Sequence, residues 1–145
     1  MSNEPTAFTD SELAYLAGQR LGRLATIAPS GAPQNNPVGF TVNAELGTID
    51  IFGFNMGKSK KYRNVQANPK VAFVVDDLAS VDPWVVRGVE IRGIAEALEE
   101  VAPPMAQMPH QVIRIHPKRI ISWGVDSGAP SRSARNVTGG TNEAA

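Results

Sequence analysis

The hydrophobic pattern of this chain changes from a period of 3.6 residues to a period of two after about the first twenty residues. Alternating apolar segments separated by short Gly, Pro and Asn turns follow, and such segments are typical of β-strands. Only one helix interrupts them, between the third and fourth strands, so alternation of strands and helices is absent. The pattern therefore predicts a mainly β fold, a six-stranded Greek-key barrel with a few helices. We expect strands over residues 23–28, 34–42, 48–54, 70–76 and 85–98, and over 112–116 and 118–125 around Pro117.

Two short helices accompany these strands. The first follows Thr9, which has the spacing of a capping box with Glu12, and Gly22 is a plausible stop. The second runs from about Ser59 to Asn68, because the residue before a proline avoids the helical region. The first three strands are joined by short turns and should pair antiparallel.

Length and composition indicate one folded domain. A chain of 145 residues buries roughly 70% of its unfolded surface, enough for a core without disulfides, and cysteine is absent. We expect a cofactor-binding domain over residues 1–125 and a mobile tail over residues 126–145, which are rich in Ser, Gly, Ala and Thr. The first ten residues do not resemble a signal peptide, and the longest apolar run, Val71–Val75, is too short to span a bilayer. These features predict a cytoplasmic protein with no membrane partner.

Charge is balanced overall but concentrated at one place. Fourteen Lys and Arg residues match fourteen Asp and Glu residues, and a neutral chain lacks the electrostatic footprint of a nucleic-acid binder. Four of the six residues in 58–63, KSKKYR, are basic. This stretch runs from a glycine-containing loop into a helix start, where free amides and the helix dipole already favour an anion. It is either a phosphate site, with Ser59 capping the helix or donating its hydroxyl, or a solvated basic helix face.

Other candidate residues lie on the predicted strands. The carboxamides of residues 34–36 match the donors and acceptors of a flavin pyrimidine edge, or they simply face solvent. Pro37 removes a ladder amide, which marks an edge or a bulge. Arg87 falls on the apolar face of its strand and needs a partner, an exit to water or a ligand, unless a bulge at Gly88 turns it outward.

Metal and hydrolase chemistry have no support in the sequence. His110 and His116 flank a strand without an acidic companion at metal-ligand spacing, so no metal site is expected. No nucleophile elbow or Ser-His-Asp arrangement occurs, and no catalytic residue is assigned. Trp123, in a late strand, is either a stacking residue or an ordinary core tryptophan.

Two stretches of the chain carry a family pattern. Residues 22–38 read GRLATIAPSGAPQNNPV, and the pattern S-x-K-x-x-N-x-x-x-N-P is met by Ser59, Lys61, Asn64, Asn68 and Pro69. Together they resemble the flavin-binding split-barrel superfamily related to pyridoxamine-phosphate oxidase. Within it, the chain is most similar to the actinobacterial branch that uses the deazaflavin coenzyme F-420. The resemblance runs from about Leu13 to Trp123.

This resemblance implies a homodimeric split barrel with the cofactor at the dimer interface. The cofactor phosphate would lie near Ser59 and Lys61, the ring system against the hairpin around Gln34 to Val38, and Trp123 close by. A strand apolar at consecutive positions, residues 70–76, and the apolar helix face independently favour a homodimer, because both exceed what one small barrel buries. We expect cofactor contacts from Gln34, Asn36, Pro37, Val38, Ser59, Lys60, Lys61, Arg63, Arg87 and Trp123.

The expected function is that of an oxidoreductase in which coenzyme F-420 transfers hydride to a small organic acceptor. F-420 carries a lactyl-oligoglutamate tail beyond its phosphate, which extra basic residues such as Lys58 would accommodate. The alternatives are an FMN-dependent oxidase or reductase of the same fold, and a protein that binds flavin or F-420 without turnover.

Overall fold

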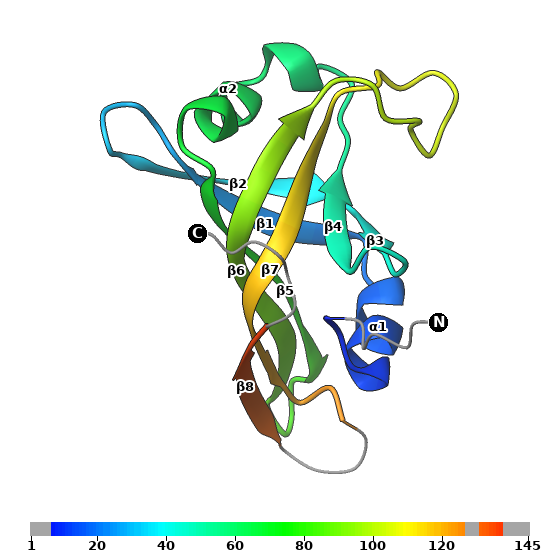
Figure 1. Cartoon of the computed structure of the whole chain (residues 1–145). Coiled ribbons are helices and arrows are strands. Elements are labelled where there is room, and N and C mark those ends of the chain that lie inside the picture. The colour runs from blue at the N-terminus through cyan, green and yellow to red at the C-terminus, as the bar shows by residue number, and fades with distance from the viewer. Residues whose placement is uncertain (1–6, 127–130, 138–145) are drawn as a thin grey trace.

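The computed structural model describes residues 7–126 and 131–137 of the chain. Its helices are α1 (Asp10–Ala17), the 3-10 helix η1 (Met56–Lys58) and α2 (Lys60–Ala67). Its strands are β1 (Leu21–Ile27), β2 (Pro33–Gly39), β3 (Thr41–Asn43), β4 (Thr48–Ile51), β5 (Lys70–Ser80), β6 (Val85–Leu98), β7 (Val112–Trp123) and β8 (Arg132–Asn136). In Figure 1, α2 lies at one end of the long strands β6 and β7, and α1 lies toward their other end.

All strands belong to one antiparallel sheet that returns on itself. Their order is β2-β1-β5-β6-β7-β4-β3, and β8 pairs with β7 off this path. The two ends of the path, β2 and β3, are separated in the sequence only by Phe40. They are two parts of one bent strand, of which the first pairs with β1 and the second with β4. The predicted mainly β split barrel is confirmed, including the antiparallel pairing of its first strands.

The predicted number of strands, six, needs correction. The predicted second strand, residues 34–42, is divided at Phe40 into β2 and β3, and the two segments predicted around Pro117 are one strand, β7. Arg132–Asn136 forms β8 within the segment expected to be a mobile tail, so that expectation is corrected for these residues. Residues 127–130 and 138–145 of the predicted tail lie outside the described residues.

Close packing along β6 explains its two glycines. Gly93 pairs with Pro117 where the β6–β7 register shifts, and a Cβ at Gly93 would meet the carbonyl group of His116. The irregularity lets β7 continue through its proline. The register is continuous at Gly88, where the ring of Trp123 occupies the space that a Cβ would need. The irregularity of β6 is therefore at Gly93, and the bulge considered at Gly88 is absent because Gly88 is a packing position.

The core fills the inside of the barrel and includes one side of α1. Phe73 and Ile91 on neighbouring strands are almost fully buried, and so is Leu16 of α1. The half-buried Leu13 and the buried Leu16 of α1 thus pack against the core of their own chain, whereas Ala17 is exposed. On the outer face of β5, Ala72 and Val74 are half-buried. No helix in the described part of the chain is long and apolar enough to cross a membrane.

A buried carboxylate joins α1 to β8. Glu12 and Thr9 form the predicted capping box, with backbone-to-side-chain hydrogen bonds of 3.0 and 3.1 Å. Both carboxylate oxygens of Glu12, which is 1% exposed, also accept hydrogen bonds from Arg135 at 2.6 and 2.9 Å. Burial by itself raises the pKa of Glu12, but hydrogen bonds from Arg135, Thr9 and Ser122 outweigh it and hold that pKa below its ordinary value. Glu12 therefore connects α1 to the last described strand.

Replacing Glu12 by Gln should preserve the capping box, because Gln serves equally at this helix position, and remove the ion pair with Arg135. We expect the free energy of unfolding to fall by about 1.5–3 kcal/mol at neutral pH, as for a lost hydrogen bond to a charged group. Because the folded-state pKa of Glu12 is lowered, the carboxylate stabilises fully above its ordinary value of 4.5, and this stability is lost as the pH falls through the folded value.

Urea unfolding of wild-type protein and E12Q at neutral and acidic pH measures both effects. The difference between the two proteins should shrink at acidic pH, whereas Glu100→Gln, which removes an exposed carboxylate, should change little at either pH. A difference that stays constant across this range contradicts the assigned role of Glu12.

Candidate functional site

The N-terminus of α2 presents free backbone amides. Ser59 is the cap residue, and its hydroxyl accepts from the Tyr62 amide at 3.2 Å and donates to the Met56 carbonyl at 2.7 Å. Of the two roles expected for Ser59, the structure contains the cap, and its hydroxyl proton is already used within the chain. The amides of Lys60 and Lys61, in the first turn, have no carbonyl partner within the helix. These two amides are the donors left for an anion.

The basic side chains around this helix start are not neutralised. Lys58, Lys60 and Lys61 make no ion pair within the described residues, and Lys61 is half-buried while the other two are exposed. Arg63 is also exposed and donates to the Lys58 carbonyl at 2.8 Å, which ties the loop to the helix. Uncompensated positive charge beside free amides makes this place suited to a phosphate group.

Asn64, which was not among the predicted cofactor contacts, fixes α2 to the barrel. Its side chain is 2% exposed, and the amide nitrogen donates to the Thr26 hydroxyl at 3.0 Å and to Gln34 Oε1 at 2.8 Å. Thr26 and Gln34 are cross-strand partners on β1 and β2. The signal was present in the sequence, because Asn64 is the central asparagine of the S-x-K-x-x-N pattern. Its role is to hold the basic helix start at a set position relative to β2.

The strand β2 brings the predicted carboxamides to the same side as α2. Gln34, Asn36 and Val38 share one face by alternation, and of these Val38 is buried and Asn36 is exposed. Pro37 points to the opposite face and is exposed. Because Gln34 accepts from Asn64, its own amide N–H groups are directed elsewhere and are available to a ligand. The structure therefore groups Gln34 with the helix start that carries Ser59 and Lys61.

Arg87 already has a carboxylate partner. It donates to both oxygens of Asp77 at 3.0 and 2.6 Å, and its guanidinium lies 5.1 Å from the centre of the Tyr15 ring. The Tyr15 hydroxyl donates to the same carboxylate at 2.9 Å. The hydrogen bond from Arg87 lowers the pKa of Asp77 despite partial burial. The partner that the sequence required for Arg87 is thus Asp77 of its own chain.

Trp123 and Arg87 lie far from α2 within one chain. Trp123 is half-buried and pairs with Gly88, next to Arg87 at the start of β6. The hydroxyl of Tyr62 in α2 donates to the carbonyl of Leu98 at the other end of β6, at 2.8 Å. Leu98 follows Arg87 by 11 positions, which is about 35 Å along an extended strand. The structure divides the predicted cofactor contacts into an α2–β2 group and a Trp123 group.

Comparison with known proteins agrees with this fold. Residues 8–124 match the pyridoxamine 5'-phosphate oxidase family. A 5a,11a-dehydrotetracycline/5a,11a-dehydrooxytetracycline reductase from Streptomyces rimosus subsp. rimosus is 47% identical over an alignment of 135 residues, and the match covers 90% of this chain and 94% of the reductase.

Two solved structures extend the comparison. A conserved hypothetical protein from Mycobacterium tuberculosis has a TM-score of 0.65 at 27% identity, covering 86% of this chain and 90% of that one. An F420 reductase has a TM-score of 0.57 at 26% identity, covering 74% of this chain and 93% of that one. Since the family match spans most of the chain, this chain belongs to the pyridoxamine 5'-phosphate oxidase family, a family of oxidoreductases.

Proposed function

We propose that this protein is a reductase that uses coenzyme F-420, with the cofactor phosphate at the N-terminus of α2 and the ring system against β2. The observation that carries the proposal is the uncompensated positive charge of Lys58, Lys60 and Lys61 beside the face of Gln34 and Asn36. An anionic cofactor with a polar ring edge matches both the positive charge of the lysines and the carboxamides of Gln34 and Asn36. The F420 reductase of the same fold supports the choice of cofactor.

The tail of the cofactor favours F-420 over FMN. Both molecules carry a phosphate, so the amides of Lys60 and Lys61 serve either one. F-420 adds an oligoglutamate tail, whose carboxylates require further cations along the surface. Lys58 and Arg63 extend the positive charge beyond the helix start, whereas Arg87 is paired with Asp77 and is not needed in this arrangement.

A second copy of the chain would complete the site. Trp123 and the α2–β2 group lie at opposite ends of β6 in one chain, so one cofactor cannot touch both unless they come from different chains. Leu78 and Val86 are exposed, pair across β5 and β6, and share the face of Trp123 by alternation. An exposed apolar face of this kind is suited to burial against another subunit. We therefore propose a homodimer in which each cofactor contacts both chains.

The protein's part in the reaction is placement. F-420 held by these residues would supply the hydride for reduction of a conjugated C=C bond, with the second hydrogen taken as a proton from solvent. The Streptomyces relative supports an acceptor of the dehydrotetracycline kind, a polycyclic molecule with such a bond. Within this scheme, Lys60, Lys61 and their amides hold the phosphate, and Gln34 orients the ring edge.

Cofactor identity is tested by titrating F-420 and FMN side by side at two salt concentrations. F-420 should bind more tightly at low salt, and its advantage should shrink as salt rises, because exposed charges are screened over about 8 Å at physiological ionic strength. Charge reversal at Lys58 should penalise F-420 more than FMN by about 1 kcal/mol or less, whereas reversal at the distant, exposed Lys118 should not. Equal affinities at low salt, or a preference for FMN, would contradict the F-420 assignment and favour FMN as the cofactor.

Two variants in the same titrations test the anchor. Lys61→Ala should weaken both cofactors by about 1.5–3 kcal/mol, the range for a hydrogen bond to a charged group. Ser59→Ala should weaken cofactor binding by only about 1 kcal/mol. This variant removes the helix cap, but it does not remove a phosphate donor. If both variants keep their fold and their dissociation constants, the phosphate binds elsewhere.

Turnover separates a reductase from a protein that only binds the cofactor. Reduced F-420 mixed with the protein and 5a,11a-dehydrotetracycline should be oxidised, as followed by absorbance. A cofactor spectrum that stays unchanged while binding is saturated contradicts the reductase assignment.

A further inference from the structure

Strand β8 places an arginine beside Trp123, in a segment that was expected to be a mobile tail. β8 pairs antiparallel with the second half of β7, and in that register Arg132 is the direct partner of Trp123. Side chains of directly paired residues point to the same face, with Cβ atoms about 4.5–5.5 Å apart. In Figure 1, β8 lies beside the ends of β6 and β7 that are far from α2. Arg132 therefore belongs to the Trp123 group of the divided site.

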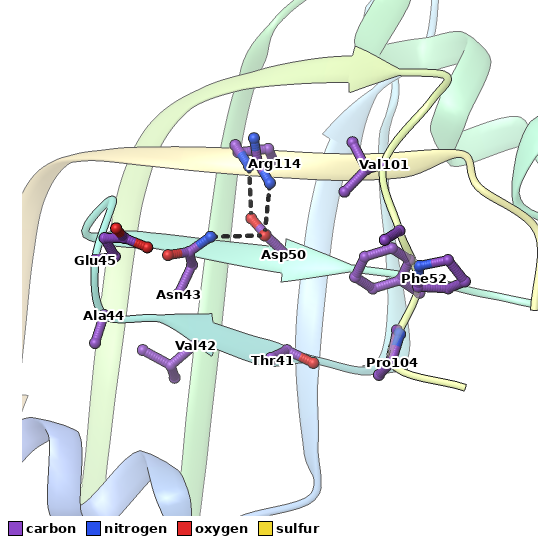
Figure 2. Close-up of a pocket in the computed structure, with 12 residues that line it drawn as sticks. Thr41, Val42, Asn43, Ala44, Glu45, Asp50, Phe52, Val101, Pro104 and Arg114 are labelled. Carbon is purple, nitrogen blue, oxygen red and sulfur yellow. Dashed lines mark hydrogen bonds and ion pairs between the residues drawn. The ribbon is translucent and has the colours of Figure 1, made fainter. Parts of the chain in front are cut away.

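Arg132 differs from the other arginines on strands because it has no partner within the chain. Arg114, for example, donates to both oxygens of Asp50 at 2.9 Å each (Figure 2). Every other strand arginine also bonds an Asp, Glu or Asn side chain: Arg23, Arg87, Arg92, Arg119 and Arg135. Arg132 is exposed and makes no ion pair or side-chain hydrogen bond within residues 7–126 and 131–137. Its guanidinium is available to an oxygen from outside the chain.

The position of Arg132 is fixed by the strand that carries it. β8 pairs with β7 along its whole length, from Arg132 to Asn136. Arg135 points to the opposite face by alternation, where it bonds the buried Glu12 at 2.6 and 2.9 Å. One arginine of β8 thus anchors the strand, and the other is presented on the face of Trp123.

Trp123 offers a flat surface next to this cation. Its ring fills the space above Gly88 on β6, where a Cβ would collide with the indole. Arg132 lies on the other side, because β7 has β6 along one edge and β8 along the other. An aromatic surface with a guanidinium at its border suits a flat ring that carries an acidic oxygen.

Other charges near Trp123 do not take the place of Arg132. The charged side chains on the same face of the neighbouring strands are already bonded within the chain: Asp76 to Arg23, Glu90 to Arg92, and Arg119 to Asn136. Asp126, beyond the end of β7, is exposed and makes no ion pair with Arg132. Arg132 is therefore the unpaired cation beside Trp123 among the described residues.

The deazaflavin ring has two ends, and only one of them faces β2 in the proposed site. The pyrimidine edge lies against Gln34 and Asn36 of one chain, so the benzenoid end is left for the Trp123 group of the second chain. In F-420 this end carries an acidic hydroxyl, whose negative charge spreads over the conjugated ring, whereas in FMN it carries methyl groups. Guanidinium groups form strong hydrogen bonds to ionised oxygens, and a methyl group gives Arg132 no acceptor.

We infer that Arg132 distinguishes F-420 from FMN at the ring: it binds the ionised hydroxyl of the benzenoid end, from the chain opposite to the one that holds the phosphate. The inference rests on the proposed function for the cofactor and for the shared site. It adds a second point of recognition, on β8, to the recognition of the tail by Lys58 and Arg63.

Titration of wild-type protein and Arg132→Gln with F-420 and FMN measures this contact. R132Q should bind F-420 about tenfold or more weakly, because a charge-assisted hydrogen bond is lost, and should bind FMN as wild type does. Since the contact is enclosed between two chains, the loss should persist at high salt, unlike the effect of charge reversal at Lys58. Arg132→Lys keeps the charge without the planar fork and should recover part of the F-420 affinity.

Arg20→Gln is the matched control and should bind both cofactors as wild type does. Arg20 is also exposed and without an ion pair in the described part of the chain. It precedes β1, which β5 and β6 separate from β7.

The absorbance of bound F-420 gives a readout that a merely structural role of Arg132 would not move. The absorption band of the deazaflavin depends on whether its hydroxyl is ionised, so a pH titration follows this one group. A guanidinium nearby favours the ionised form, and in wild type and R20Q the midpoint should lie about one pH unit below that of free F-420. R132Q should lose this shift, and R132K should keep part of it.

The outcomes separate this inference from the proposed function. If wild type prefers F-420 to FMN while R132Q leaves both the affinity and the ionisation of F-420 unchanged, the role of Arg132 is overturned and the cofactor assignment stands. An equal loss for F-420 and FMN would also overturn it, since the FMN ring carries no hydroxyl. If F-420 fails to bind wild-type protein, the proposed function falls and the assignment of Arg132 falls with it.

Discussion

The buried amide of Asn64 is the contact on which the geometry of the candidate site depends. One nitrogen donates to Thr26 on β1 and to Gln34 on β2, so a single side chain joins the helix to two strands. An eight-residue helix is too short to be stable alone, and this contact sets where its basic start lies. It also occupies Gln34 Oε1, which leaves the amide N–H groups of Gln34 outside this contact. Charge at α2 and polarity at β2 are thus held together by one residue.

The long strand β6 imposes the second constraint. It places the Arg87–Asp77 pair and Trp123 at one end and α2 at the other. A cofactor that touches Trp123 and α2 at once must therefore lie between two chains.

Local signals in the sequence predicted local structure well. The capping box of Thr9 and Glu12 and the bounds of β6 are confirmed, because each depends on neighbouring residues and turn chemistry. The strand Arg132–Asn136 was missed because its pairing with β7 and the ion pair from Arg135 to Glu12 join residues far apart in the sequence. Such contacts leave no periodic signal in a polar segment.

The candidate site was predictable to the same extent. The S-x-K-x-x-N pattern marked the helix and its asparagine, and the structure explains Ser59 as cap and Asn64 as bridge. The partner of Arg87 was not predictable, because Asp77 faces it only through the register of β5 and β6. The Asp50–Arg114 pair likewise depends on the pairing of β4 with β7. The cofactor contacts themselves stay predictions.

Complementation between two defective variants tests most directly whether the cofactor site is shared between chains. Lys61→Ala and Trp123→Ala should each bind F-420 poorly as purified dimers. If the site draws Lys61 from one chain and Trp123 from the other, mixing and subunit exchange should restore tight binding in about a quarter of all sites, because random pairing gives half heterodimers with one intact site each. No recovery after demonstrated exchange, or full binding by a stable monomer, would contradict the shared site.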